Sequence, residues 1–419
     1  MSVLRSMMTQ VADFLDRHGR LILAGVILVQ IVGGSLYAIS LGDAIAFADE
    51  RDYLNLATNL WEKRLYTQGG LNPTAFRPPG YPLILSLGYG LGGRVVHLRM
   101  LNFVALAIST YLLNRMLKRN GQPLGATLSS LIVLGYPVLF YAAGTLFPQT
   151  IATTLFLSAI FLITGNRPNW VKAILAGLIL GYVVLMVPLF LFVLVVVPGY
   201  SLWKKEPSIG IAILVVVSSS FVFGLWSFRN YVVFDRFVFI SSNSGYNLLL
   251  GNSAASTPSA GVTEELTSYY FEGGRELGLD EIDRDNYFRA EVMDYMLKNP
   301  LKASGFYSLK VLNYFNYRND LRTESESSEL RDLLMFATYG PLLVLVATRI
   351  VLIRRFPLSS LEQLFAILYI ASAFASAVFF TRIRFRLPFD FLLIGIVAAF
   401  LDQLLREKMT QRTPLDPVF

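Results

Sequence analysis

The sequence predicts an all-α protein that crosses a membrane about ten times. Its 419 residues are 54% hydrophobic and 16% charged, with a mean hydropathy of +0.53, whereas a soluble domain carries about 25% charged residues. The apolar residues form blocks of about 17 to 25, the length of a membrane-spanning helix. These blocks are continuous rather than alternating, which disfavours a β-barrel.

We place ten spans, and about 10 to 12 fit the pattern, because the pair at 172–203 is broken by Pro188 and Pro198. The spans lie at residues 20–42, 97–117, 124–142, 146–164, 172–187, 188–203, 208–228, 333–353, 361–380 and 388–405. Lys and Arg residues cluster before the first span and after every second one. The positive-inside rule makes that side cytoplasmic, so we expect both termini there. No small-residue cleavage site follows a short apolar core near the N terminus, so we expect no signal peptide.

This topology divides the chain into six segments. They are the cytoplasmic N terminus with the first span (1–42), a first outer loop (43–96), a transmembrane bundle (97–228), a second outer loop (229–332), the C-terminal spans (333–405) and a cytoplasmic tail (406–419). Within the outer loops, the residue pattern predicts amphipathic helices at 50–63 and 280–298. It also predicts helices in the membrane interface at 81–93 and 301–317. The helix at 280–298 would cover an outer cavity, and whether it touches substrate stays open.

Composition excludes several kinds of site. The chain has no cysteine, so it has no disulfide and no thiol nucleophile. Its two histidines, His18 and His97, are too few for a histidine metal cluster. We interpret the net charge of +7 as a sign of membrane topology rather than of nucleic-acid binding. The expected partners are membrane lipids and a lipid-linked substrate, with no nucleic acid.

Four arginines stand on the outer side, against the orientation that the other basic residues set. Arg229 ends a span, and Arg382, Arg384 and Arg386 alternate in TRIRFRLPFD. An extended chain would place these last three on one face. An arginine at the centre of a membrane helix costs about 2.5–3.5 kcal/mol. The guanidinium fork pairs well with phosphate, so we favour a phosphate site. The alternative is contact with lipid headgroups, or pairing with Asp390, Asp320 or the carboxylates of the first loop.

Three carboxylates follow the first span in FADERDY: Asp49, Glu50 and Asp52. Helix capping explains acidic residues here, since Asp49 suits an N-cap and the first turn favours negative charge. That explanation is sufficient for Glu50 and Asp52. Asp49 lies just beyond the membrane, and beside a bound phosphate its carboxylate could accept a proton from an attacking hydroxyl.

Several motifs resemble those of a known family. Asp49-Glu50-x-x-Tyr53 followed by Arg77-Pro78-Pro79-Gly80-Tyr81-Pro82 resembles the first periplasmic loop of type C glycosyltransferases (GT-C), in particular bacterial relatives of protein O-mannosyltransferases and lipid A aminoarabinose transferases. Residues 226–252 resemble the family's W-x-x-R-N-Y and S-x-N-x-G-x-N-L-x-x-G-N segments, and Arg384-Phe385-Arg386-Leu387-Pro388 resembles its R-Y-R-x-P segment. The motifs keep the family's order over residues 20–405. Arg77 departs from the pattern, because the lipid A enzymes have lysine there.

The resemblance implies a GT-C-like fold and an inverting transfer of a hexose or pentose from a polyprenyl-phosphate carrier to an acceptor hydroxyl. The reaction would take place at the periplasmic, extracytoplasmic face of the cell inner (plasma) membrane. Combined with the charge argument, it gives Asp49 as the base, with Glu50 and Tyr53 supporting it or contacting the acceptor. The remaining expected roles are donor-phosphate binding by Arg77, Arg382, Arg384, Arg386 and Arg229, and a sugar or acceptor loop with Tyr81, Asn243, Gly245, Asn247 and Asn252. The acceptor could be a glycan, a lipid or a protein.

Other functions and a metal requirement stay open at this point. A transporter or flippase of a lipid-linked sugar would use the same arginines without a base, although it would place charges within the spans. A non-catalytic scaffold would not need these motifs together. Some relatives hold a divalent metal at the acidic pair. No further acidic motif accompanies Asp49 and Glu50, so we expect no required metal, and Mg²⁺ or Mn²⁺ is the alternative.

Overall fold

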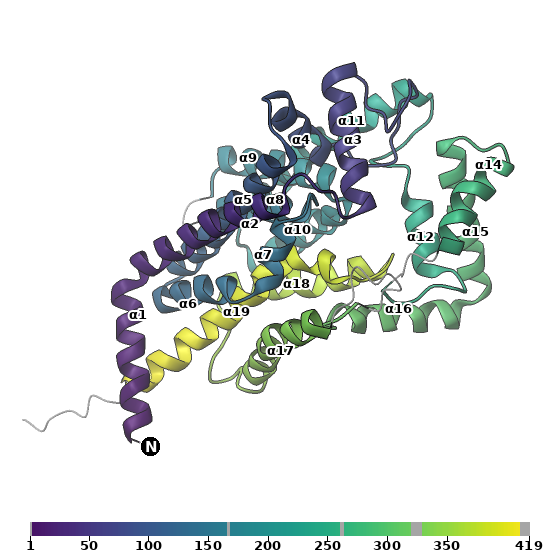
Figure 1. Ribbon diagram of the computed structural model, residues 1–419. Helices are drawn as coiled ribbons and strands as arrows, with labels where there is room; N and C mark the ends of the chain where they lie inside the picture. The colour runs from purple at the N-terminus through teal and green to yellow at the C-terminus, as the bar shows by residue number, and fades with distance from the viewer. Residues whose placement is uncertain (1, 166–167, 260–263, 320–328, 411–419) are drawn as a thin grey trace, which may run out of the picture.

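Every regular element in the described part of the chain is helical (Figure 1). The structure is a computed structural model and describes residues 2–165, 168–259, 264–319 and 329–410. Over these ranges the all-α prediction is confirmed. The longer helices form a bundle, and the shorter helices of the two outer loops gather at the end away from the N terminus (Figure 1).

Six helical stretches in the described residues are long and apolar enough to cross a membrane. The first, Gln10–Leu41, joins α1 (Ser2–Leu28), the π-helical turn η1 (Val29–Gly33) and α2 (Gly34–Leu41). The others are α5 (Val95–Arg119), α11 (Ile209–Phe234), α17 (Glu329–Val351), α18 (Ser360–Ala377) and most of α19 (Ile383–Thr410). The chain is therefore a multi-pass membrane protein.

The other four predicted spans are helical but short or broken. α6 (Pro123–Leu134) and α7 (Pro137–Ala143) form one apolar stretch bent by 62°, which makes a seventh span if counted as one. α8 (Gln149–Ile163) and α9 (Trp170–Met186) have only 15 and 17 residues. α10 (Val193–Lys204) follows the 3-10 turn η2 (Pro188–Phe192). By length and composition alone, six or seven of the ten predicted spans qualify, and the others are shorter apolar helices. Proline accounts for the breaks, since α6, α7 and η2 each begin with a proline, which cannot continue a preceding helix.

α19 is the central helix of the bundle. It packs against α6, α8, α17 and α18. Two buried polar contacts attach it to its neighbours: Asp402 accepts the backbone N–H of Gly125 at 2.7 Å, and the Tyr136 hydroxyl donates to Asp390 at 2.9 Å. Its last turns lie beside α1 (Figure 1). Nη2 of Arg406 in α19 is 3.9 Å from Oδ1 of Asp16 in α1.

Small residues allow α9 and α11 to pack closely. A Cβ atom on Gly177 would lie 2.5 Å from the carbonyl oxygen of Val215, and one on Gly181 would lie 2.6 Å from that of Ser219. The Ser219 hydroxyl also donates to the Gly177 carbonyl at 2.8 Å. Close approach of this kind is how helices associate in lipid, where apolar burial gives little drive.

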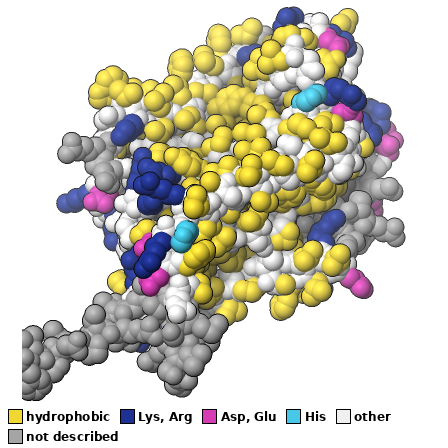
Figure 2. Space-filling model, turned by 60° about the vertical axis from the view of Figure 1, so that its left-hand side comes forward, with side chains coloured by type: hydrophobic (Ala, Val, Ile, Leu, Met, Phe, Trp, Pro, Cys, Tyr) yellow, Lys and Arg dark blue, Asp and Glu magenta, His cyan; other side chains and the backbone are white. Residues whose placement is uncertain are grey.

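The outer surface of the bundle is apolar. Figure 2 shows a continuous hydrophobic surface across the middle of one face, with charged side chains at its margins. Large exposed side chains contribute to the apolar surface of the molecule, among them Leu28 and Leu36 on the first span and Phe221, Leu225 and Phe228 on α11. In water such a surface would aggregate, whereas lipid tails cover it without cost.

The outer loops contain the helices that the residue pattern predicts. The first loop holds α3 (Ala48–Lys63) and α4 (Gly80–Gly90), close to the predicted 50–63 and 81–93. The second holds α12 (Ser244–Asn252), α13 (Glu264–Ser268), the π-helical η3 (Tyr269–Gly273), α14 (Gly274–Glu276), α15 (Glu281–Lys298) and α16 (Pro300–Tyr314). α15 and α16 agree with the predicted 280–298 and 301–317. The four predicted helices are therefore present, and the interfacial position of α4 and α16 stays a prediction.

The two outer loops form one unit. They share an apolar cluster that contains Phe76, Leu249, Leu250, Tyr270 and Phe288. At its edge the Glu281 carboxylate accepts from the Thr74 hydroxyl at 2.6 Å, the Ala75 amide at 2.8 Å and the Ser242 hydroxyl at 2.5 Å. Because one carboxylate accepts hydrogen bonds from both loops, it fixes the position of the two loops relative to each other.

Candidate active site

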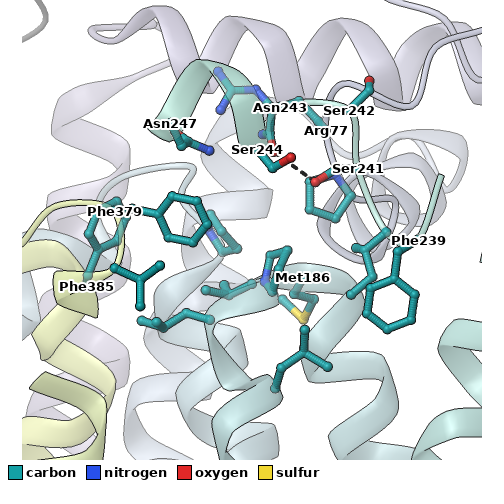
Figure 3. A pocket seen from close by; sticks show the side chains of 18 of the residues that line it. Arg77, Met186, Phe239, Ser241, Ser242, Asn243, Ser244, Asn247, Phe379 and Phe385 are labelled. Atoms are coloured by element: carbon teal, nitrogen blue, oxygen red, sulfur yellow. Dashed lines mark hydrogen bonds between the residues drawn. The ribbon is translucent and has the colours of Figure 1, made fainter. Parts of the chain in front are cut away.

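A cavity of about 630 Å³ lies between the two outer loops and the helical bundle. Its walls come from α3, α8, η2, α12, α15 and the connection from α18 to α19, and most of its lining is apolar. In Figure 3, Asn243, Ser244 and Asn247 lie along one side, Met186 lies opposite, and Phe239, Phe379 and Phe385 flank the space.

Three charged side chains from distant parts of the sequence meet at this cavity. Asp49, in the first turn of α3, accepts a hydrogen bond from Nη2 of Arg77 at 2.6 Å and one from Nη1 of Arg384 at 2.9 Å. Arg77 also donates to Asp52 at 2.9 Å. The cavity lining includes Asp49, Arg77 and Arg384. The structure thus brings the predicted base together with two of the predicted phosphate ligands.

Both arginines keep donors that no described residue uses. Nε of Arg77 and Nε of Arg384 are buried without an acceptor, and Arg384 donates a hydrogen bond to a described residue only through Nη1. The guanidinium carbon of Arg384 lies 4.9 Å from the ring centroid of Phe147, and that of Arg77 lies 5.5 Å from that of Tyr53. A guanidinium held over an aromatic ring keeps its orientation, so its remaining N–H groups can receive an anion.

The charge state of Asp49 follows from these neighbours. Burial acts to raise the pKa of Asp49, but the two positive charges and their hydrogen bonds outweigh burial and hold this pKa well below its usual range. The carboxylate is therefore ionised. It is also a weak base as long as both arginines hold it, because a proton would have to displace their hydrogen bonds.

Glu50 has a structural position next to Asp49. α3 begins at Ala48 with Phe47 as its N-cap, so the prediction that Asp49 caps the helix is wrong. Glu50 caps it instead: its carboxylate accepts the backbone N–H groups of Ala46 at 3.0 Å and Phe47 at 3.1 Å. It also accepts the N–H of Leu146 at 2.7 Å, just before α8. Glu50 therefore ties the start of α3 to the start of α8.

The acidic pair does not fit a divalent metal. Both oxygens of Asp49 accept from arginines, and both oxygens of Glu50 accept from backbone amides. A hard cation needs several converging oxygen ligands. No group of three or more His, Cys, Asp or Glu side chains in the described ranges could supply them.

The arginine triplet does not share one face. The prediction rested on an extended chain, whereas α19 begins at Ile383, and residues two apart in a helix point in different directions. Arg384 faces the cavity. Arg386 is fully buried outside it, donates to the carbonyls of Tyr314 at 2.9 Å and Asn316 at 2.6 Å, and pairs with Asp390 at 3.1 Å.

Arg382 and Arg229 also lie outside the cavity lining. Arg382 is buried and donates to the Ser259 carbonyl at 3.0 Å. Arg229 donates to the Thr74 carbonyl at 3.2 Å, with its guanidinium carbon 4.6 Å from the ring centroid of Trp226. Their protein partners explain both positions. The structure therefore does not place Arg382, Arg386 or Arg229 at the cavity with Arg77 and Arg384, contrary to the prediction of one shared phosphate site. The alternative partner Asp320 lies outside the described residues.

The predicted sugar loop divides into two groups. Asn243 and Asn247 line the cavity. Gly245 instead permits close packing, because a Cβ there would lie 2.1 Å from the carbonyl oxygen of Asp285. Asn252 accepts from the buried ammonium of Lys310 at 2.7 Å and donates to Val378 at 3.1 Å, so it joins α12 to the end of α18.

Two predicted tyrosines pack together beside Asp49. The ring centroids of Tyr53 and Tyr81 lie 5.3 Å apart in an edge-to-face arrangement. Tyr53 lines the cavity, whereas Tyr81 is fully buried behind it. Tyr81 therefore supports the ring over which Arg77 lies and does not face the cavity.

Sequence reasoning missed the polar edge of α15. Ile282, Asp285, Asn286 and Arg289 line the cavity. The prediction drew on the apolar residues of this helix, such as Phe288 and Val292, which pack in the outer-loop cluster on the other face. Asp285 accepts the Gly245 amide at 2.6 Å and the Ser244 hydroxyl at 2.9 Å, so it caps α12. The spacing of 282, 285, 286 and 289 marks one helical face and could have revealed it.

Structural comparison finds proteins that match most of the chain. The crystal structure of ArnT from Cupriavidus metallidurans bound to undecaprenyl phosphate matches with 13% identity and a TM-score of 0.41, over 94% of this chain and 81% of that one. The apo state of the same protein matches with 13% identity and a TM-score of 0.40, over 90% and 77%. No protein-family model and no curated protein sequence matches the chain. ArnT is a GT-C lipid A aminoarabinose transferase, from one of the groups whose motifs this sequence resembles. At these TM-scores the likeness concerns the general arrangement of helices and assigns no role to any residue.

Proposed function

We propose that this protein is an inverting glycosyltransferase that moves a monosaccharide from a polyprenyl-phosphate carrier to an acceptor hydroxyl. One observation carries the proposal: Asp49 is held between Arg77 and Arg384 at the wall of a large, mostly apolar cavity. A phosphate ligand, a proton acceptor and space for a lipid are the three requirements of this reaction. The described chain offers all three in one place.

The chemistry needs little beyond charge and position. The acceptor oxygen attacks the anomeric carbon from the face opposite the phosphate, the bond from that carbon to the phosphate oxygen breaks, and the electron pair leaves with the polyprenyl phosphate. Arg77 and Arg384 stabilise the negative charge of the leaving group. Asp49 accepts the acceptor's proton, a step worth about 10²–10⁴ in rate.

The arginines control the basicity of Asp49 in this scheme. A donor phosphate accepts hydrogen bonds from the same guanidinium groups that now hold the carboxylate. Each hydrogen bond that passes to the phosphate leaves Asp49 less stabilised as an anion, and its pKa rises towards the ordinary value. Binding of the donor therefore turns Asp49 from a paired ion into a usable base.

The apolar part of the cavity suits a prenyl chain. Its lining includes Met186, Val187 and η2, which contribute only apolar side chains. Phe237 and Phe239 also line it and are 73% and 44% exposed, so this flank of the cavity reaches the outside of the protein. A lipid-linked donor would enter here from the outer leaflet of the plasma membrane, on the extracytoplasmic side, opposite the basic clusters.

Sugar transfer by the purified protein in lipid nanodiscs tests the proposal. The substrates are a panel of polyprenyl-phosphate sugars with acceptor extracts, and the readout is release of polyprenyl phosphate. We expect the wild type to release it and Asp49→Asn to be at least about 100-fold slower while still binding the donor. A wild type that binds donors and never releases the phosphate would favour a lipid-linked sugar transporter.

A further inference from the structure

The N terminus of α8 opens onto the cavity without an assigned role. Phe147, Pro148 and Gln149 all line the cavity. α8 has 15 residues, no side-chain cap and no acidic residue in its first turn. The backbone N–H groups of Gln149, Thr150 and Ile151 donate to no described residue. The positive end of a helix thus reaches the cavity with its donors unused.

The Gln149 side chain gives a second, independent sign of a ligand. It is 7% exposed, lines the cavity, and its carboxamide makes no hydrogen bond to a described residue. Oε1 in particular is buried without a partner. A buried unpaired carboxamide is costly in a folded protein. Its Nε2 group donates to no described residue, so it can supply hydrogen bonds to an anion that enters from the cavity.

Contacts around α8 place this helix end next to the charged group. Phe147 carries the guanidinium of Arg384 over its ring, 4.9 Å from the ring centroid. Glu50, the neighbour of Asp49, fixes the preceding Leu146 amide at 2.7 Å. Arg384, with its unused Nε and Nη2 donors, and Gln149, the first residue of α8, therefore line the same cavity. Backbone donors at a helix N terminus beside a guanidinium favour an anion over a neutral sugar.

We propose that the N terminus of α8, with the Gln149 carboxamide, binds the phosphate group of the lipid carrier together with Arg384. This inference rests on the proposed function and adds a phosphate site that the charged residues alone do not make. It also explains why Glu50 joins the starts of α3 and α8: the base and the phosphate site must keep a fixed separation for in-line displacement.

Binding of undecaprenyl phosphate to the full chain in nanodiscs tests this inference, with undecaprenol as the lipid without phosphate. Gln149→Leu removes the carboxamide at similar size and should weaken undecaprenyl phosphate about tenfold. Gln149→Glu places a negative charge where the phosphate binds and should weaken it about 100-fold or more. Neither variant should change undecaprenol binding. A glutamate in a first helical turn favours the helix, so Gln149→Glu should fold.

A matched control separates the site from a general effect of charge. Asn169 is the N-cap of α9, outside the cavity lining, and its side chain accepts the Lys172 amide at 2.9 Å. Asn169→Asp also adds a negative charge to a helix N terminus, and it should leave undecaprenyl phosphate binding unchanged. Equal weakening by Asn169→Asp and Gln149→Glu would overturn the inference.

The remaining outcomes separate this inference from the proposed function. If the wild type binds undecaprenyl phosphate and Gln149→Glu binds it equally well, the α8 site is wrong and the proposed function stands. If the wild type does not bind it, both fail. Adding millimolar inorganic phosphate to the binding assay identifies the source of the anion. If it competes with undecaprenyl phosphate for the wild type but not for Gln149→Glu, the site also accepts free phosphate. A Gln149 effect without competition supports one that takes only the lipid-linked group.

Discussion

Replacing the proposed base should make the lipid phosphate bind more tightly. In the structure the Asp49 carboxylate pairs with Arg77 at 2.6 Å and with Arg384 at 2.9 Å. These are the same guanidinium groups that would bind a phosphate. Asp49→Asn removes the competing charge and keeps the shape of the side chain. We therefore expect a variant that transfers sugar at least about 100-fold more slowly but binds polyprenyl phosphate more tightly than the wild type does.

The size of this effect follows from the distances. A phosphate bound to the same guanidinium groups would lie about 5 Å from the Asp49 carboxylate, and two unit charges at this separation repel by about 3 kcal/mol at an effective dielectric constant of 20. The side chains of Asp49, Arg77 and Arg384 are 26%, 18% and 26% exposed, so solvent screens part of this repulsion. A gain of about 1.5–3 kcal/mol corresponds to an affinity about 10 to 100 times higher.

Titration of undecaprenyl phosphate into wild-type and variant protein in nanodiscs measures this gain. Asp52→Asn is the control, because Asp52 contacts Arg77 at 2.9 Å and makes no contact with Arg384. We expect Asp52→Asn to change the affinity by less than about threefold. If Asp49→Asn binds as well as or more weakly than the wild type, the carboxylate and the phosphate do not share these arginines, and our account of the site is refuted.

Three further predictions concern neighbouring residues. Glu50→Gln should lower the free energy of unfolding by about 2–3 kcal/mol, because its carboxylate accepts three backbone N–H groups; thermal unfolding in lipid measures this loss. Arg384→Ala should fold normally and lose most polyprenyl phosphate affinity, whereas Arg386→Ala should unfold because it leaves Asp390 buried and unpaired, at a cost of about 3–5 kcal/mol; equal stability of the two variants would contradict this. Burial lowers the pKa of Lys310 from 10.5 to about 8, so the folded protein binds fewer protons than the unfolded chain between these values. The stability of the wild type relative to Lys310→Met should therefore rise with pH across that window, and unfolding temperatures of both proteins from pH 7 to 10.5 check the sign.

Much of the architecture could be predicted from local patterns. Continuous apolar blocks identify membrane helices, and apolar residues spaced three and four apart at 50–63 and 280–298 identify amphipathic ones. These patterns depend on neighbours three or four residues apart, so the sequence displays them directly. The sequence predicts helix capping near Glu50 but places the N-cap at Asp49, two positions after the observed Phe47. Either an aspartate or a glutamate near a helix start can supply the cap, so the pattern does not fix the position.

The site itself depended on contacts that no local pattern contains. Asp49 and Arg384 are separated by 335 positions and meet at 2.9 Å. Arg384 and Arg386 look alike in the sequence, yet one faces the cavity and the other is buried against Asp390, because α19 starts at Ile383 and turns them apart.

The sequence by itself thus determined the class of protein, most of its helical segments and the carboxylate and arginines that meet at the cavity. The tertiary structure alone decided which arginines reach the cavity, that α15 contributes Asp285 and Arg289, and that α8 directs Gln149 into it. The physical reason is range. Helix formation and membrane insertion follow from residues close in sequence, whereas a binding site follows from the packing of elements hundreds of residues apart.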